Sequence, residues 1–550
     1  MNTPPSPDNN TPALPTQAVV KQNPFAYKAF TVLWLATVLS NIGTWIHDVG
    51  AGWLMTSLSQ SSPVWVSLTQ AATTLPVFLL ALPAGALADK VNRKYMLMIV
   101  QTCLLLVANI LGIVVAAGKA TPLILLLFTF FMGVGAAMTS PVWQAIVPSL
   151  VPRAALQQAV AMNSVGVNIS RAIGPVLAAV LIGSLGIAAP FFVNALSFML
   201  VLLALFWWQP PAAAEKRLPP EALAGAVRAG WRYALHSELL RAPLLKAAGF
   251  FVFASAYWAL LPLIAKQVLH GNVSLYGILL GCIGIGAIGG ALLLPALRKR
   301  KSADQLLLLG AIGTILTLCV FALVQNNYAA GAVCLIAGAS WIAVLTSLNT
   351  SVQISLPDWV RARGLAVFIM VFFGSQTLGS IIWGQAASHI GIQAALLLAA
   401  AGLGLAMFIM RRLHLPNDQT VNLASSLHWP EPLVDASVTH DRGPVMITVT
   451  YQIAPENTAV FLSAVYRLRK ERLRDGAYSW GIFEDTVQKG QYLEYFIVAS
   501  WLEHLRQHER VTEHDRDIQT ELLQYHCGDE PPKVAHFVAP YPDSINAADK

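Results

Sequence analysis

Charged residues are scarce in this 550-residue chain. Asp, Glu, Lys and Arg together make up 11% of it, whereas soluble proteins carry about 25%. The deficit is not uniform, because residues 30–412 are nearly all apolar while residues 413–550 have the composition of an ordinary soluble domain. This distribution predicts a membrane-embedded body followed by a soluble tail.

Cysteine is also rare, and its placement argues against a redox or metal framework. The five cysteines are odd in number and scattered, and four of them lie in apolar runs. No metal-ligand spacing occurs among them, so the sequence predicts no disulfide, no metal site and no cofactor. The N-terminus also lacks the basic, apolar and small-residue order of a cleaved signal peptide.

Twelve apolar spans fill residues 30–412, and each is long enough to cross ~30 Å of hydrocarbon. Basic residues gather in alternate turns, while the other turns hold little beyond Lys119 and Lys266. The positive-inside rule therefore predicts a multi-pass membrane protein with both termini in the cytoplasm. Because the basic residues lie in these turns, the net charge of +7 does not indicate nucleic-acid binding.

An internal repeat divides the spans into two halves. Shifting the sequence by 205 residues places Gly174 on Gly379 and Gly186 on Gly391, without gaps over six spans. We therefore predict an all-α membrane protein with twelve transmembrane helices in two six-helix pseudo-symmetric halves. The solute is expected to bind between the halves, near the membrane midplane.

A short charged turn, GALADKVNRK, joins the second and third spans. Gly85 allows close helix contact, Asp89 suits a helix N-terminus, and Arg93 and Lys94 favour the cytoplasmic side. These residue types alone could also form a generic basic loop. Their order resembles the signature loop between helices 2 and 3 of the major facilitator superfamily, which implies a conformational role in a secondary transporter.

Two charges lie inside the spans, where a charge costs at least ~2.5–3.5 kcal/mol and marks function by default. Asp48 lies in the first span and Arg171 in the fifth, both past the midpoint toward the outer side. A carboxylate whose partner and burial change can take up and release a proton. We expect Asp48, biased by Arg171 and by His47, to couple transport to the proton gradient. The alternative is a structural ion pair or an interfacial Asp near the outer mouth.

The fifth span also carries Gly166, Gly174 and Pro175, which allow tight helix packing and a kink. Their pattern resembles the Gly-Pro motif of superfamily members that export by proton antiport. Here Ala178 and Ala179 replace the final glycines of that motif. The resemblance favours export over import.

A few polar and aromatic residues are candidates for lining the solute cavity, although each could equally join two helices. Few charges and several aromatics suit a bulky, amphiphilic or aromatic solute. The candidates are Asn41, Trp45, Gln144, Trp341 and Asn349.

The tail changes its hydrophobic period. Alternating apolar residues and the order β-α-β-β-α-β, with one long helix over 501–526, predict a ferredoxin-like α+β domain. It resembles the small dimeric α+β barrel domains related to antibiotic-biosynthesis monooxygenases, and we expect a regulatory or dimerising module. His504 and His508 could bind a metal, but a solvated helix face is expected because no third ligand can be assigned.

At the level of the whole membrane part, SNIGTWIHDVGAGWLM, GALADKVNRK and NISRAIGP resemble the branch that includes the enterobactin exporter and the transmembrane secretion effectors. The resemblance implies export of a siderophore- or drug-like solute by proton antiport and alternating access, with no enzymatic role. The alternatives are a membrane-anchored enzyme that uses the tail, and a non-transporting scaffold. The predicted boundaries are a disordered N-terminus at 1–24, a first half at 25–208, a cytoplasmic linker with an amphipathic helix at 209–243, a second half at 244–413, a linker at 414–442, a ferredoxin-like domain at 443–540 and a tail at 541–550.

Overall fold

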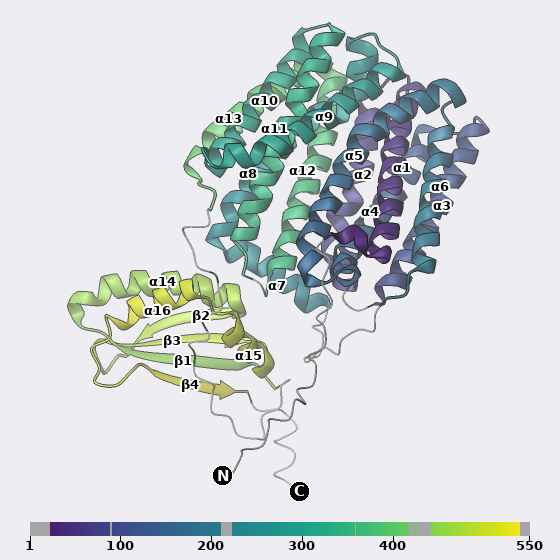
Figure 1. Ribbon diagram of the computed structural model, residues 1–550. Coiled ribbons are helices and arrows are strands. Elements are labelled where there is room, and N and C mark those ends of the chain that lie inside the picture. The colour runs from purple at the N-terminus through teal and green to yellow at the C-terminus, as the bar shows by residue number, and fades with distance from the viewer. Residues whose placement is uncertain are drawn as a thin grey trace, which may run out of the picture.

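The computed structural model describes residues 23–88, 91–210, 223–357, 359–416, 423, 426, 429 and 442–539. Most of the predicted N-terminal segment and the tail at 541–550 lie outside these ranges. Within them, twelve helices are long and apolar enough to cross a membrane, and they form a bundle beside a small α+β domain (Figure 1).

The twelve-helix prediction is confirmed. The first half contains α1 (Lys28–Leu58), α2 (Pro63–Ala88), α3 (Arg93–Ala116), α4 (Pro122–Leu150), α5 (Arg153–Leu185) and α6 (Ala189–Trp207). The second contains α8 (Glu238–Leu263), extended by a π-helical turn (Ile264–Val268), then α9 (Val273–Arg298), α10 (Ala303–Leu323), α11 (Asn327–Ile354), α12 (Arg361–Ile390) and α13 (Ile392–Ile409).

The two halves repeat each other in local detail. Helices α5 and α12 each end on a glycine, Gly186 and Gly391, whose φ angles are +86° and +83°. Glycine takes this left-handed conformation without the steric cost that a Cβ atom brings. These two glycines are related by the 205-residue shift, so the repeat seen in the sequence is a repeat of structure.

We call the end of the bundle that lies away from the α+β domain the distal end. The halves pack together mainly through two helix pairs, α2 with α12 and α5 with α9. Along α9, Gly284 lies so close to α5 that a Cβ atom on it would be 2.6 Å from the Cα of Ala172. Between α2 and α12, the hydroxyls of Thr74 and Thr377 share a 2.7 Å hydrogen bond.

Further contacts join the halves at the distal end itself. Lys266 Nζ donates to the carbonyl and hydroxyl oxygens of Thr56, at 3.2 and 3.3 Å. The rings of Trp53 and Tyr276 stack with centroids 6.1 Å apart. One member of each pair comes from each half, so the distal end is held together by contacts between the halves.

Helix α7 (Leu223–His236) connects the halves at the end of the bundle nearest the α+β domain (Figure 1). It has the two faces that its sequence predicts, since Trp231 and Leu235 are exposed while Tyr233 is buried. The Tyr233 hydroxyl donates to the carbonyl of Ser355 at 3.1 Å. The helix is therefore anchored to the turn between α11 and α12 by its Tyr233 face.

The C-terminal domain has the predicted ferredoxin-like topology. Its four strands are arranged in the order β2-β3-β1-β4, and all neighbours are antiparallel. The elements are β1 (Val445–Gln452), α14 (Thr458–Asp475), β2 (Ser479–Glu484), β3 (Gln491–Val498), α15 (Trp501–Arg510), α16 (Glu513–Leu523) and β4 (Lys533–Val538).

One prediction for this domain is wrong. The single helix expected over 501–526 is two helices, because Val511 is extended (ψ 129°) and Thr512 begins α16 with a capping box to Asp515. The N-terminus of α15 carries only one of the two hydrogen bonds of a capping box. Ser500 accepts from the backbone NH of Glu503, whereas the Glu503 carboxylate turns to Arg510.

Buried charges occupy the space between the sheet and α14. The Glu494 carboxylate accepts hydrogen bonds from Arg472 at 3.2 Å, from Trp480 at 3.0 Å and from the Tyr451 hydroxyl at 3.1 Å. In the described part of the domain, the cavity beside these residues, next to Trp429, has a volume of about 10 Å³. That is room for about one water molecule, not for an organic substrate.

The expectation that His504 and His508 form a solvated helix face is wrong. The His504 side chain is buried, its Nε2 lies 3.3 Å from that of His508, and the ring of His536 packs 4.8 Å away. Burial and the neighbouring imidazoles lower the pKa of His504 to about 3 and that of His508 to about 4. No group of three His, Cys, Asp or Glu residues able to hold a metal occurs in the described ranges.

These buried imidazoles predict that the domain loses stability in acid. The pKa of His504 is 6.5 in the unfolded chain and about 3 in the folded one, so below pH 6.5 only the unfolded chain binds that proton. The free energy of unfolding then falls as the pH drops. His504→Gln should reduce the slope of the unfolding free energy against pH by the contribution of about one proton. The control His514→Gln should leave that slope unchanged. The measurement is amide hydrogen exchange of β1 in the full chain at pH 7 and pH 5. Equal pH effects in H504Q and the parent would contradict it.

Candidate solute-binding cavity

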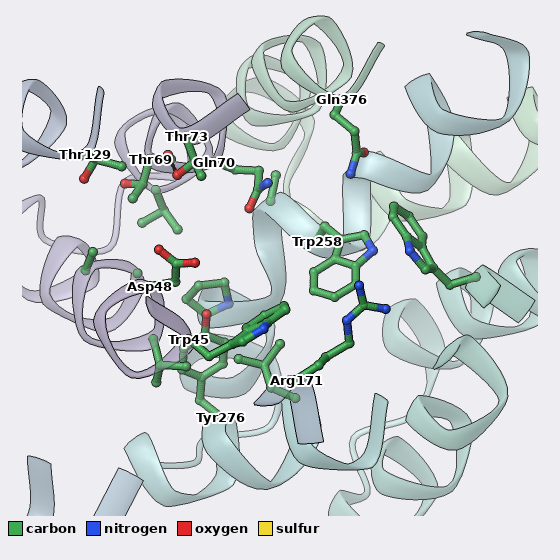
Figure 2. A pocket seen from close by; sticks show the side chains of 18 residues that line it. Trp45, Asp48, Thr69, Gln70, Thr73, Thr129, Arg171, Trp258, Tyr276 and Gln376 are labelled. Atoms are coloured by element: carbon green, nitrogen blue, oxygen red, sulfur yellow. Dashed lines mark hydrogen bonds between the residues drawn. The ribbon is translucent and has the colours of Figure 1, made fainter. Parts of the chain in front are cut away.

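A cavity of about 180 Å³ lies between the two halves (Figure 2). Its walls come from both halves, since Asp48 of α1 and Arg171 of α5 face it together with Trp258 of α8 and Gln376 of α12. The indoles of Trp45, Trp258 and Trp341 also line it. The cavity therefore combines aromatic surface with one acidic and one basic side chain.

Asp48 and Arg171 face the same cavity without forming an ion pair. An ion pair requires a nitrogen and an oxygen within 4.0 Å of each other. Among the described residues, no oxygen of Asp48 lies that close to a nitrogen of Arg171. Figure 2 shows the two side chains apart, with the Trp45 ring near the guanidinium. The Arg171 Cζ lies 5.8 Å from the Trp45 ring centroid, and its Nε is buried without a hydrogen-bond partner. A solute entering the cavity would thus meet an acid and a base that are separately available.

His47 is not positioned as the sequence suggests. It is buried, its ring packs edge-on against Phe191 of α6 with centroids 4.9 Å apart, and neither ring nitrogen has a hydrogen-bond partner. It is absent from the residues that line the cavity. This geometry does not place His47 to exchange a proton with Asp48.

The other expected cavity residues divide into two groups. Trp45 and Trp341 lie in the cavity wall. Asn41 and Asn349 are half-buried and Gln144 is exposed, and none of the three is among the lining residues. The structure therefore does not bring these three side chains into the cavity wall.

Several polar residues that line the cavity are not among those predicted from the sequence. Thr69, Gln70 and Thr73 form a polar face of α2, and Thr129 of α4 lines the cavity beside Thr69 (Figure 2). Their spacing on α2 is a helical i, i+1, i+4 pattern, but hydroxyls in membrane helices usually bond to their own backbone, as Thr73 does to Thr69 at 3.1 Å. No single feature of the sequence distinguishes these hydroxyls from the many others in the spans.

Two residues of the signature turn act as hydrogen-bond donors to the ends of neighbouring helices. Arg93 donates to the carbonyl of Ala145 on α4 at 3.0 Å, and Lys94 donates to the carbonyl of Trp208 after α6 at 2.5 Å. Gly85 makes no close contact, since nothing lies within 4 Å of where its Cβ would be. Asp89 lies outside the described residues.

The repeat of this turn makes an equivalent contact. Arg298, which corresponds to Arg93 under the shift, donates to Thr350 Oγ1 at 3.1 Å and to the carbonyl of Thr346 at 3.2 Å. Thr350 itself corresponds to Ala145. In each half, an arginine of this turn therefore donates to the equivalent helix, α4 in the first half and α11 in the second.

The Gly-Pro segment of α5 serves close packing in this structure. A Cβ on Gly166 would lie 2.6 Å from Val38 on α1, and one on Gly174 would clash with Trp45. On the other side, the carbonyl of Pro175 faces Gly277 of α9. This packing positions Trp45 and Arg171 in the cavity wall, because both sit within or against the same segment.

Comparisons with known proteins agree with this arrangement. A family model described as "transmembrane secretion effector" matches residues 20–542. The chain is 26% identical to the staphyloferrin A transporter of Staphylococcus aureus over 362 residues, which cover 64% of this chain and 87% of that one. It is also 26% identical to the enterobactin exporter EntS of Citrobacter koseri over 343 residues, covering 61% and 80% of the two chains.

Solved structures support the fold. A bacterial homologue of the human lysosomal transporter Spinster, in an inward-facing and unoccupied conformation, matches with a TM-score of 0.57 at 17% identity. The match covers 71% of this chain and 98% of that one. The family and these relatives are transporters, not enzymes. The chain therefore belongs to the transmembrane secretion effector family of the major facilitator superfamily.

Proposed function

We propose that this protein exports a small siderophore- or drug-like solute across the bacterial inner membrane by proton antiport and alternating access. The observation that carries the proposal is the cavity between the two halves, with Asp48 as its acidic residue. The printed functions of two relatives, a staphyloferrin A transporter and an enterobactin exporter, support a solute of this kind.

The basic turns support an orientation with α7 and the α+β domain in the cytoplasm. In that orientation the distal end faces outward, and the contacts of Lys266 with Thr56 and of Trp53 with Tyr276 cover the cavity from outside. We infer that a state closed at its outer end in this way receives solute from the cytoplasm. Export requires these contacts to separate and the opposite ends of the halves to approach.

The aromatic wall of the cavity supports a bulky solute with flat rings. Three indoles, those of Trp45, Trp258 and Trp341, offer faces on which a ring can stack. Gln70 and the hydroxyls of α2 offer hydrogen bonds to the polar groups of the same solute. This combination suits the amphiphilic solutes that the sequence composition suggests.

Asp48 is the residue through which we propose that protons drive transport. It is a carboxyl group inside a membrane helix, and no ion pair among the described residues fixes its charge. Its protonation can therefore follow the side of the membrane to which the cavity is open. Arg171 lines the same cavity without forming an ion pair with Asp48, so the two charges can act on a solute or a proton separately.

Asp48→Asn should uncouple transport from the proton gradient. In proteoliposomes, solute movement driven by a pH gradient should fall at least about tenfold, while solute exchange without a gradient continues. Asp48→Glu, which keeps a carboxyl group, should retain coupling. The solutes to screen are siderophores and amphiphilic drugs, with a protonophore as a control for the gradient. Full gradient-driven transport by D48N would refute the role of Asp48.

We also propose that two copies associate through the face of the C-terminal sheet that no described helix covers. Phe483, Leu493 and Phe537 are 59%, 39% and 53% exposed, and strand register places them on the face opposite α14. Exposed apolar clusters of this kind mark interaction sites, and the domain resembles dimeric ones. Phe483→Glu should convert a dimer to a monomer in light scattering of the detergent-solubilised protein. A parent that is monomeric at micromolar concentration would contradict this.

A further inference from the structure

The α+β domain is fastened to the membrane bundle by specific polar contacts. Arg232 of α7 donates to the carbonyl of Gly476 at 3.2 Å and to the Glu503 carboxylate at 3.3 Å. The guanidinium of Arg510 lies over the ring of Trp359, 4.6 Å from its centroid. Residues of the domain thus reach both α7 and the turn that precedes α12, of which the structure describes residues 355–357 and 359–360.

Tyr233 of α7 is the centre of this interface. Its ring packs edge-on against Trp359 with centroids 5.8 Å apart, and the Arg474 guanidinium lies 5.6 Å from the ring centroid. Its hydroxyl donates to the carbonyl of Ser355. This one buried side chain of the linker helix therefore contacts both the turn before α12 and the α+β domain.

The charges at this interface are largely removed from water. The side chains of Arg510, Glu503 and Arg232 are 4%, 16% and 18% exposed. Burial alone would raise the pKa of Glu503, but Arg510 and Arg232 hold it below its ordinary value. Separating a desolvated, hydrogen-bonded charge from its partner costs much free energy, whereas separating an exposed surface pair costs little. The contact of Arg232 with Glu503 therefore resists separation more than the exposed ion pair of Lys470 with Glu238 nearby.

The domain contacts elements that must move if the two halves of the bundle rotate relative to each other. The turn 355–360 leads directly into α12, which pairs with α2 of the other half, and α7 contacts both α2 and α12. Gly230 of α7 lies so close to α12 that a Cβ on it would be 2.9 Å from the Cβ of Arg363. These contacts exist in a state whose distal end is closed. A domain that binds one state better than another shifts the equilibrium toward that state.

We propose that the α+β domain is an intramolecular clamp: docked on α7 and on the turn 355–360, it stabilises the state with the closed distal end. The distal end opens only when these contacts release. The clamp regulates the alternating access proposed above and rests on it. Cellular signals that bind the domain or its dimer would act on transport by changing how tightly it docks.

The test compares Arg232→Gln with Arg228→Gln. Arg228 lies one turn earlier on α7 and its side chain is exposed, so it is a matched control for charge and helix. The five native cysteines are first replaced, and spin labels are attached at Lys119→Cys and Tyr328→Cys, at the distal end of each half. The distance between the two labels then reports opening of the distal end. R232Q should increase the population with a widened distal distance at least about fivefold, and R228Q should match the parent. Equal populations in R232Q and R228Q would overturn the clamp.

Hydrogen exchange distinguishes release of the domain from its unfolding. In R232Q, the amides of 355–360 should exchange faster, while those of β1 should exchange as in the parent. Faster exchange at 355–360 with a distal distance that stays closed would also overturn the clamp. These readouts need no solute, so they separate failure of the clamp from failure of the proposed transport.

A cross-link supplies the opposite perturbation, in case R232Q disturbs folding. Lys470 and Glu238 form an ion pair between α14 and the start of α8, and these two long side chains together span more than a bare disulfide can. Cysteines at both positions can therefore be joined by a bis-methanethiosulfonate reagent of matching length, whose two disulfide bonds lock the docked domain. The reagent should abolish the widened population, and reduction should restore it. A cross-linked protein that opens as freely as the reduced one would refute the clamp.

Discussion

The arrangement of this protein depends on how closely the backbones of α5 and α9 approach. Gly277, Gly281 and Gly284 of α9 face α5 without side chains, and a Cβ on any of them would lie within 2.8 Å of an atom of α5. In a membrane, where lipid competes for apolar surface, such close backbone packing is a main source of helix association. This packing joins the halves toward the distal end. The cavity that Asp48 and Arg171 line lies on the other side of the contact between α5 and α9.

A repeated scaffold here carries a cavity that is not symmetric. The scaffold repeats in its helix ends, in its arginine contacts to α4 and α11, and in the positions of Arg171 and Gln376, both of which line the cavity. The charges do not repeat, since the equivalent of Asp48 is Phe253. The packing therefore repeats in both halves, whereas the one carboxyl group that lines the cavity in the described part of the chain, Asp48, belongs to the first half.

Much of the fold could be predicted from the sequence because its cause is local. Long apolar spans have to be helices in hydrocarbon, and strand alternation with turn residues outlines the α+β domain. The break between α15 and α16 was missed because Val511 carries no helix-stopping signal of its own. It is the capping box at Thr512 that begins the second helix. The burial of His504 was missed because it depends on His536 and the sheet, which are distant in sequence.

The cavity could be predicted only in part, for a related reason. Asp48 and Arg171 stand out in sequence because charge is expensive in lipid, and the structure places both in one cavity. Asn41 and Gln144 are equally polar yet lie outside its lining, because helix rotation decides which face points inward. The docking of the α+β domain on Tyr233 and Trp359 had no sequence signal, since it joins segments more than a hundred residues apart.

The most direct test of this account is a cross-link across α5 and α9. Val176 faces Gly281, so Val176→Cys with Gly281→Cys, in a chain without its native cysteines, can be oxidised to tie the distal contact shut. The account predicts that the oxidised protein binds solute but does not move it across the membrane, and that reduction restores transport. Undiminished transport with the cross-link intact would contradict it.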